Sequence, residues 1–171
     1  MKGFIQIYTG NGKGKTTAAL GLALRAAGAG KKVFIAQFVK GQIYSEVKAI
    51  NELIPSIVIR QYGLECFIHQ EPTQADIDIA RKGFKEATDI ILSGKFDIVV
   101  LDEANIAIHY KLFSADELLE VLKQKPEETE IIITGRRAPP ELIEAADLVT
   151  EMLEIKHYYN NGVEARAGIE C

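Results

Sequence analysis

The sequence predicts an α/β fold in which a mostly parallel central sheet of about six strands is covered by helices on both faces. Six short apolar runs alternate with segments of helical period along the whole chain. Four of these runs are nearly continuous and rich in β-branched residues, as strands buried on both faces should be. Because no repeat, low-complexity tract or linker divides the chain, we expect a single domain over residues 1–171.

The strands are predicted where the apolar runs are shortest and most β-branched. They cover Phe4–Tyr8, Val33–Phe38, Ile57–Arg60, Ile98–Leu101, Ile131–Thr134 and Leu148–Met152. Residues 156–171 are polar and interrupted by glycine, so we expect them to form a C-terminal tail packed on the domain.

Helices are predicted from periodic apolar positions and from their start and stop signals. An Ala/Leu-rich helix follows the first strand over Ala18–Ala27. The longest helix carries apolar residues at spacings of three and four, and Thr73 with Asp76 should begin it and Gly94 should end it. A capping box opens another helix at Ser114, and a further one should start at Pro139-Pro140. The apolar positions of the longest helix are Ile77, Ala80, Phe84, Ala87 and Ile91.

A phosphate-binding loop lies between the first strand and the first helix. It matches the pattern G-x-x-x-x-G-K-[ST], except that Thr9 stands where the first glycine would be. Glycines let successive backbone N–H groups point at phosphate oxygens, and the helix N-terminus adds partial positive charge. Lys15 supplies a mobile full charge, and the Thr16 hydroxyl is placed to coordinate Mg²⁺. The residues expected to bind ATP here are Thr9, Gly10, Asn11, Gly12, Lys13, Gly14, Lys15, Thr16 and Thr17.

A pair of carboxylates follows the fourth predicted strand. Asp102 and Glu103 end the run that begins at Phe96, as acidic residues do in a Walker B segment, and either of them could hold Mg²⁺. Arg136 or Arg137, after the fifth strand, could lie at the same sheet edge and stabilise phosphate charge. The residues therefore predict a three-layer, RecA-like P-loop NTPase-like fold with a Mg·ATP site, and they leave open which bond of ATP is broken.

Composition narrows the classes of partner and the compartment. The net charge is −4, which argues against nucleic acid held by bulk charge. We expect no membrane association, because no apolar run approaches the roughly 20 residues that span a bilayer. Cys66 and Cys171 form no CxxC pair, which fits a reducing compartment without a disulfide framework or a cysteine zinc site. With no secretory signal at the N-terminus, a cytoplasmic location is expected.

Taken together, these segments resemble the ATP:corrinoid adenosyltransferases. The matching stretches run from the first strand to the tail, and their ordered set is far more specific than the loop alone. They are Tyr8–Ala19, Gln37–Gly41, Val100–Glu103, Ile133–Arg136, Ala146–Met152, Lys156–His157 and Gly168–Glu170.

The resemblance implies a transferase of adenosylcobalamin (vitamin B12) biosynthesis and salvage. In this family a corrinoid reduced to Co(I) attacks the 5′ carbon of ATP, triphosphate leaves, and ATP lies in the reverse sense from ordinary P-loop enzymes. Lys15, Lys13 and Thr16 would then be the catalytic residues that stabilise the leaving triphosphate, the last of them through Mg²⁺. Arg25 and Arg136 would contact the nucleotide. The family also implies an electron donor, such as a reduced flavoprotein, and a homodimer.

The chain departs from the family pattern at two places. Aromatic residues after the third strand help to remove the lower axial ligand of cobalt in the family. Here Phe67 matches the first aromatic, but His69 stands where many members have tryptophan, so it could form a flat wall, ligate cobalt or be a plain loop residue. The first strand begins at about Phe4, without the N-terminal arm of longer members, so the tail or a second subunit is expected to close the site.

Two other functions remain open on the residues alone. A P-loop ATPase, GTPase or small-molecule kinase would use the same loop but would release or transfer the terminal phosphate. A nucleotide-dependent module that carries or senses a corrinoid without turnover would also keep the loop, and it would produce no triphosphate.

Overall fold

The computed structural model describes residues 2–64 and 71–170 and contains the six predicted strands. All five strand pairings are parallel, in the order β3-β2-β4-β5-β1-β6. The predicted α/β class with a parallel six-stranded sheet is therefore confirmed. The strands are β1 (Ile5–Thr9), β2 (Val33–Phe38), β3 (Ile57–Tyr62), β4 (Ile98–Asp102), β5 (Glu130–Thr134) and β6 (Leu148–Glu151).

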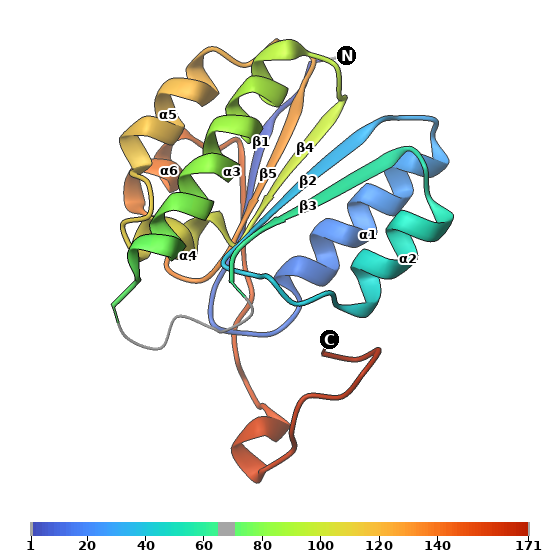
Figure 1. The fold of residues 1–171 in the computed structure, drawn as a ribbon, viewed down its shortest axis with the longest axis vertical. Helices are drawn as coiled ribbons and strands as arrows, with labels where there is room; N and C mark the ends of the chain where they lie inside the picture. Colours follow the sequence, from blue (N-terminus) through green and yellow to red (C-terminus); the bar gives the residue numbers. More distant parts are fainter. Residues whose placement is uncertain (1, 65–70, 171) are drawn as a thin grey trace.

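The helices form a layer on each face of the sheet, which gives the three layers that the sequence predicts (Figure 1). On one face, α1 and α2 pack with β2, β3 and β4 around a cluster that includes Ala23, Ile35 and Ile50. The other cluster joins α3, α4, α5 and α6 to the opposite face around Phe34 and Leu118. The helices are α1 (Lys15–Gly28), α2 (Ser45–Leu53), α3 (Gln74–Ser93), α4 (Ala104–His109), α5 (Ala115–Lys123) and α6 (Pro140–Ala145).

The start and stop signals of the longest helices are confirmed. Thr73 accepts a hydrogen bond from the amide of Asp76, whose side chain in turn accepts from the amide of Thr73. Ser114 and Glu117 form the same reciprocal arrangement at the start of α5. Gly94 ends α3 in the left-handed conformation, with φ 61°, which glycine adopts without steric penalty. These caps fix where each helix begins relative to the sheet.

The strands differ in how deeply they lie. Every residue of β2 and β4 is buried, whereas all four residues of β6, at one edge of the sheet, are exposed. Strand β3 runs two residues beyond its predicted end at Arg60, because it stays in register with β2 up to the Phe38–Tyr62 pair. The central strands therefore form a rigid base whose carboxyl ends lie at one edge.

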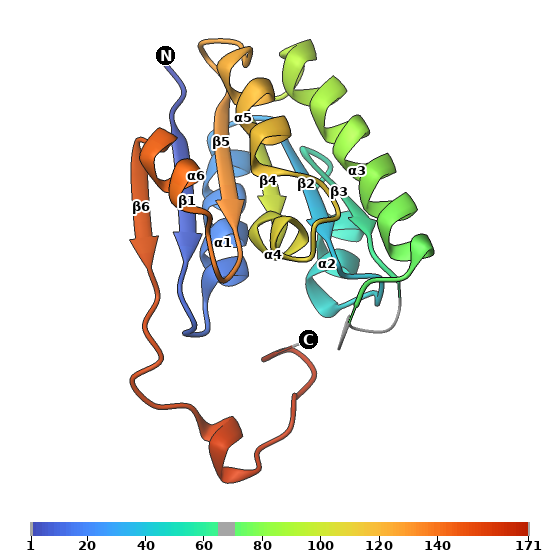
Figure 2. The same cartoon turned by 90° about the vertical axis from the view of Figure 1, so that its left-hand side faces the viewer.

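The chain beyond β6 drops below this carboxyl edge, turns at a short 3₁₀ helix (Tyr158–Asn161) and comes back toward the phosphate loop (Figures 1 and 2). The root of this tail is tied to the loop, since the amide of Gly12 donates to the carbonyl of Met152 at 2.7 Å. Across the described ranges, the structure contains no helix of the length and apolarity that a bilayer crossing requires.

Candidate active site

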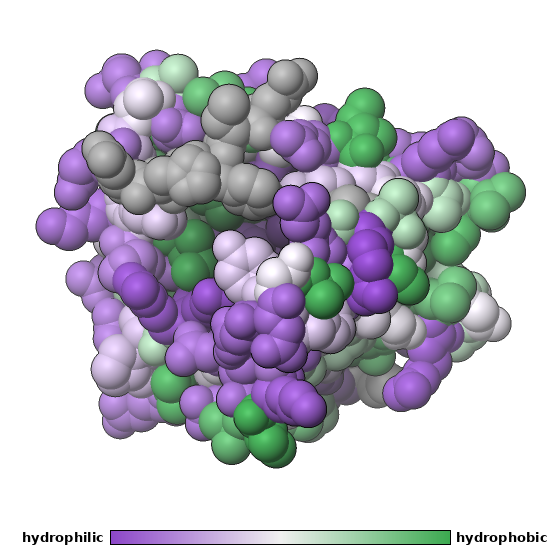
Figure 3. Space-filling view, turned by 90° about the horizontal axis from the view of Figure 1, so that it is seen from below, coloured by the Kyte–Doolittle hydropathy of each residue, from purple (hydrophilic) through white to green (hydrophobic). Residues whose placement is uncertain are grey.

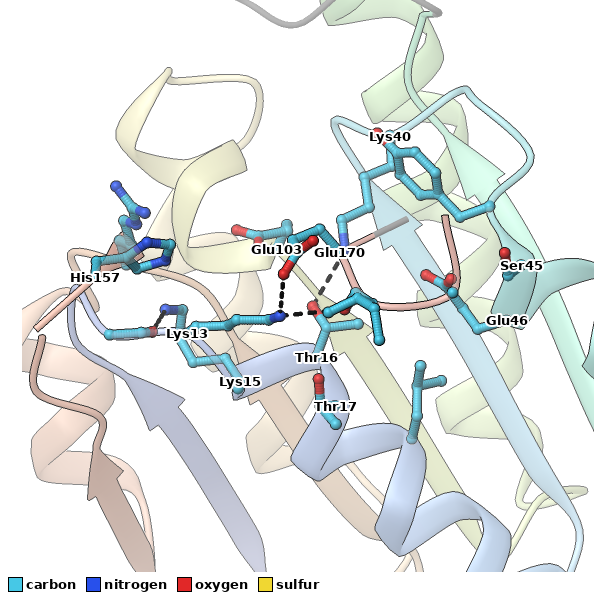
Figure 4. Close-up of a pocket in the computed structure, with 17 residues that line it drawn as sticks. Lys13, Lys15, Thr16, Thr17, Lys40, Ser45, Glu46, Glu103, His157 and Glu170 are labelled. Carbon is cyan, nitrogen blue, oxygen red and sulfur yellow. Dashed lines mark hydrogen bonds and ion pairs between the residues drawn. The ribbon is translucent and has the colours of Figure 1, made fainter. Parts of the chain in front are cut away.

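A pocket of about 500 Å³ opens at the carboxyl edge of the sheet. The phosphate loop and the start of α1 form its floor, and residues that follow β2, β4 and β5 border it. The N-terminal part of α2 and the tail complete its rim. Figure 4 shows lysines and carboxylates from these elements around one space. In open α/β sheets the carboxyl ends of strands are where ligands bind, so this pocket is the candidate active site.

Two glycines allow the loop to take its shape. Gly10 has a φ of 93°, and a Cβ there would lie 2.4 Å from the carbonyl oxygen of Met152. Gly14 has a φ of 120° immediately before α1 begins. Both conformations disfavour any residue with a side chain, and both are needed to bring the loop against the tail root and turn it into the helix. The loop therefore takes a conformation that glycine alone adopts without steric penalty at these two positions.

Lys15 is buried and folds back over the loop. Its ammonium donates to the carbonyl oxygens of Gly10 and Gly12 at 2.8 and 2.7 Å. Burial lowers the pKa of Lys15, and the charge of Arg136 also lowers it, while the charge of Glu103 opposes the shift. A phosphate group entering the pocket would offer this ammonium stronger acceptors than carbonyl oxygens, because charge-assisted hydrogen bonds are the stronger kind.

Asp102 is the centre of the hydrogen-bond network below the pocket. Its Oδ1 accepts from the hydroxyls of Thr16 at 2.9 Å and Thr134 at 2.6 Å. Its Oδ2 accepts from the side-chain amide of Gln37 at 3.1 Å and from the ammonium of Lys40 at 2.8 Å. Burial alone would raise the pKa of Asp102, but the charge and hydrogen bond of Lys40, with the two hydroxyls, outweigh it and hold the pKa below its ordinary value. Asp102 is therefore a carboxylate whose oxygens are fully engaged.

Glu103 has the opposite character although it is the next residue. It adopts the left-handed conformation with φ 58°, which is uncommon for a residue with a side chain, and its amide donates to Thr134 Oγ1 at 3.0 Å. Burial raises the pKa of Glu103, and the neighbouring charge of Asp102 raises it further. Glu103 borders the pocket, so the backbone turn at this position separates two adjacent carboxylates into an inner and an outer one.

The donor set fits a magnesium ion that arrives with a nucleotide. Thr16 and Asp102 supply oxygen atoms 2.9 Å apart, with the carboxyl of Glu103 on the adjoining residue. The ammonium of Lys40 already lies 3.1 Å from Thr16 Oγ1 and 2.8 Å from Asp102 Oδ2. Within residues 2–64 and 71–170, no cluster of three or more His, Cys, Asp or Glu side chains is suited to hold a metal ion. Proteins commonly bind Mg²⁺ through one or two carboxylates together with the phosphates of the substrate, and Asp102 and Glu103 are the carboxylates that could serve here.

Lys13 does not point at the floor of the pocket but reaches the tail. Its ammonium donates to Tyr158 Oη at 3.0 Å, to the carbonyl of Ile169 at 3.2 Å and to Glu170 Oε1 at 2.7 Å. The hydrogen bond with Glu170 raises the pKa of Lys13, and that with Tyr158 adds to it. Arg166, followed by Lys13 and Tyr158, holds the pKa of Glu170 far below its ordinary value. The tail thus carries a carboxylate with a lowered pKa to the rim of the pocket.

Comparison with known proteins decides the family. A protein-family model described as ATP:corrinoid adenosyltransferase BtuR/CobO/CobP matches residues 1–171. The chain belongs to the ATP:corrinoid adenosyltransferase family. The resemblance drawn from the sequence motifs is therefore confirmed, and so is the assignment to the transferases.

Individual relatives agree with the family match. A protein of a Sinorhizobium species named corrinoid adenosyltransferase is 38% identical, over 99% of this chain and 80% of its own length. Proteins with the same name from Pseudomonas aeruginosa and Escherichia coli K12 are each 36% identical over 99% of this chain, and the matches cover 84% and 86% of their lengths.

Several residues that the sequence predicts for this adenosyltransferase lie around the pocket, and others lie elsewhere. Arg136 borders the pocket, whereas Arg137 bonds His109 on α4. Arg25 is in the last turn of α1, about 15 Å along the helix axis from Lys15 at about 1.5 Å per residue, and it does not border the pocket. Phe67 and His69, the predicted corrinoid contacts, lie outside the described residues.

Thr9, Gly10 and Asn11 do not border the pocket, in contrast to the rest of the loop. Thr9 has a structural role, because its backbone carbonyl accepts a hydrogen bond from the amide of Met152 and its hydroxyl accepts one from the amide of Ala138. The first part of the loop is therefore attached to the tail root and to the chain after β5. Gly12 to Thr17 form the part that faces the pocket.

Sequence reasoning assigned no role to Gln37, Lys40 or Thr134, although all three fall in stretches that match this family. Gln37 is completely buried within a strand whose other residues are apolar. A polar residue in such a position is a signal that could have marked the end of β2 as part of the site. Thr134 ends β5 in the same way. The tail cluster of Tyr158 and Glu170 left no comparable signal.

Proposed function

We propose that this chain transfers the 5′-deoxyadenosyl group of ATP to the Co(I) centre of a corrinoid and releases triphosphate. The observation that carries the proposal is the set of cationic groups around the pocket. Lys15, Lys40 and Arg136 all border it, together with other residues of the phosphate loop from Gly12 to Thr17. Such a set stabilises negative charge that grows on a leaving triphosphate, which is the expected demand of this reaction.

In the proposed step, the electron pair of Co(I) forms a bond to the 5′ carbon of ATP. The bond between that carbon and its oxygen breaks, and its electron pair leaves on the triphosphate. Lys15 exchanges the loop carbonyls for phosphate oxygens, and the loop amides add further donors. Thr16 and the Asp102–Glu103 pair would hold Mg²⁺, which supplies additional positive charge to the triphosphate. The nucleophile belongs to the corrinoid, so the protein contributes position and electrostatics.

The same edge of the molecule can accommodate a broad and mostly apolar ring. Ile43 and Leu64 are exposed where the chain leaves β2 and β3, and Ile169 is exposed at the rim of the pocket. Figure 3 looks onto this edge and shows green apolar surface beside purple polar surface. Such apolar area next to the phosphate loop supports a corrinoid as the second substrate. Phe67 and His69 are proposed to contact its lower face.

The surroundings of the reaction are part of the same proposal. We expect residues 1–171 to form one domain, with the tail as the outer side of the pocket before the nucleotide binds, as supported by its contacts with Lys13. A reduced flavoprotein is the proposed electron donor for cobalt. A homodimer is proposed on the family resemblance, as is activity in the cytoplasm.

An anaerobic assay with cob(I)alamin, ATP and Mg²⁺ tests the proposal. The corrinoid spectrum and the phosphate products are followed together. Light-sensitive adenosylcobalamin with an equal amount of triphosphate is the expected result. The appearance of ADP and phosphate with an unchanged corrinoid would overturn the transferase and indicate a hydrolase or kinase. Binding of both substrates without any product would indicate a carrier or sensor.

A further inference from the structure

Lys40 is a pocket residue whose ammonium is held by two side chains of the site. It stands two residues beyond the end of β2, and its side chain reaches across the end of the sheet to Asp102 on β4. The side chain of Lys40 is 14% exposed and that of Asp102 is 1% exposed. Figure 4 shows the ammonium of Lys40 beside Thr16, at the start of α1. Neither the phosphate loop pattern nor the acidic pair requires a lysine at this place.

The turn that carries Lys40 is strained. Val39, directly before it, has a φ of 51°, which is a rare conformation for a β-branched residue. Gly63 makes room for this turn, because a Cβ at that position would lie 2.3 Å from the amide nitrogen of Lys40. Strain of this kind persists only where the surrounding structure enforces it, and it collects at functional sites. The fold therefore accepts an unfavourable backbone at Val39 while it directs Lys40 to Asp102.

The ammonium of Lys40 lies between the two side chains that fit Mg²⁺. It donates to Thr16 Oγ1 at 3.1 Å and to Asp102 Oδ2 at 2.8 Å. The charges of Glu103 and Glu46 also act on it. Since two cations this close repel each other, the ammonium in its present place disfavours a metal ion at Thr16 and Asp102.

We propose that Lys40 is a built-in counter-ion of the metal site, which keeps free divalent cations out until a metal-bound nucleotide enters. This inference rests on the proposed Mg·ATP site. When the nucleotide enters, its phosphates supply the acceptors to which the flexible lysine side chain can turn, and Thr16 becomes available to the metal. The site would thus select the metal–nucleotide complex over the metal alone, and Lys40 would add its charge to the triphosphate.

Binding of Mn²⁺ alone, measured by electron paramagnetic resonance without nucleotide, tests this inference. Lys40→Gln removes the charge but keeps a hydrogen-bond donor for Asp102, so we expect it to bind Mn²⁺ at least tenfold more tightly than the unaltered chain. Lys40→Met tests the same point should Lys40→Gln not fold. Lys40→Arg keeps the charge and should exclude the metal as the unaltered chain does.

The matched control is Lys31→Gln. Lys31 also pairs with an aspartate, Asp97, at 3.3 Å, but at the opposite end of the sheet, so its loss should leave Mn²⁺ binding unchanged. A purely structural role for Lys40 predicts the opposite sign, because a disordered site binds metal more weakly. Neutral variants that bind Mn²⁺ no more tightly than the unaltered chain would overturn the inference. Failure of the unaltered chain to bind Mn²⁺ even with ATP would instead overturn the proposed metal site itself.

Discussion

Two lysine–carboxylate pairs join a pocket lysine to a carboxylate over nearly the same N–O distance, yet they are built in different ways. Lys40 and Asp102 are 2.8 Å apart, and their side chains are 14% and 1% exposed. Lys13 and Glu170 are 2.7 Å apart, and their side chains are 40% and 17% exposed. Asp102 ends a central strand, whereas Glu170 lies on the tail. Because charges buried in the core interact more strongly than charges near water, equal distances here do not mean equal strength.

The comparison also shows which partner of each pair can be exchanged. In the inner pair Asp102 is fixed by three further hydrogen bonds, so Lys40 is the partner that can leave. In the outer pair Lys13 belongs to the loop, and Glu170 arrives with the tail. On the proposed function, Lys40 would occupy the place of a metal cation, and Glu170 would occupy the place of a phosphate anion. The pocket balances its own charges before the nucleotide enters.

The inner pair should give the largest effect. Asp102→Asn leaves the ammonium of Lys40 buried without an opposite charge, which is expected to lower the free energy of unfolding by about 3 kcal/mol. It should also reduce turnover by at least about 100-fold, because the proposed Mg²⁺, which neutralises the leaving triphosphate, loses a carboxylate partner. Denaturant unfolding and the corrinoid assay measure the two effects. Asp97→Asn, at the exposed pair with Lys31, should cost under about 1 kcal/mol and leave turnover intact. Equal effects of the two variants would contradict the contrast.

A substitution that crowds the turn before Lys40 tests how firmly the inner pair is held, and it removes no charge. Gly63→Ala would place a Cβ 2.3 Å from the amide nitrogen of Lys40 and force the turn to move. We expect a loss of about 1–3 kcal/mol of unfolding free energy, as overpacking usually causes, and weaker selection against Mn²⁺ alone. Gly21→Ala is the control, since nothing lies within 4 Å of a Cβ there. In the middle of α1 that alanine should stabilise the fold by about 0.5–1 kcal/mol. A Gly63→Ala protein as stable as the unaltered chain would show that the turn is not tightly held.

The outer pair should give a small effect of opposite sign on ligand binding. Glu170→Gln removes the carboxylate that competes with phosphate for Lys13, so inorganic triphosphate should bind about threefold more tightly, the scale expected of exposed charges. Titration calorimetry measures the affinity. Glu164→Gln, at an exposed position of the same tail, should leave it unchanged. Weaker binding of triphosphate by Glu170→Gln would mean that Glu170 assists the ligand.

The smallest effect is expected from pH. The pKa of Glu170 lies below its ordinary value. Its contribution to the stability of the folded tail is therefore present above about pH 4.3 and is lost only as the pH falls through the lowered pKa. The pKa of Lys13 is raised. Its contribution to the stability of the folded tail is therefore present below about pH 10.4 and is lost as the pH rises through the raised pKa. The Arg166 amide, which donates to Glu170 at 2.9 Å, reports on the pair by NMR. Its resonance should stay constant between about pH 5 and 9, and a transition inside that range would contradict the assignment.

Much of the fold could be predicted because its signals are local. Capping boxes at Thr73 and Ser114 and the period of α3 are written into short stretches of sequence. The sequence does not predict helix α4, since six residues are too few to show a period. It does not predict helix α2 either, because this helix buries only Val47 and Ile50.

The site also contains features that local sequence predicts and features that it does not. The loop and the acidic pair are contiguous motifs and were predicted, and their placement around ATP stays a prediction. The meeting of Gln37 with Asp102 depends on β2 lying beside β4, and these residues are 65 positions apart. Glu170 meets Lys13 across 157 positions through exposed side chains, which leave no periodic pattern. Contacts of this kind follow from topology and could not be predicted from local sequence.

Hydrogen–deuterium exchange with and without inorganic triphosphate tests most directly whether the nucleotide takes over the outer pair. Glu170 and the triphosphate compete for Lys13, so exchange in residues 157–170 should rise when triphosphate binds. Strand β4, which carries Asp102, should exchange no faster than before. Protection of residues 157–170 by triphosphate would contradict the exchange of partners, and would mean that the tail closes over the bound anion with Glu170 still in place.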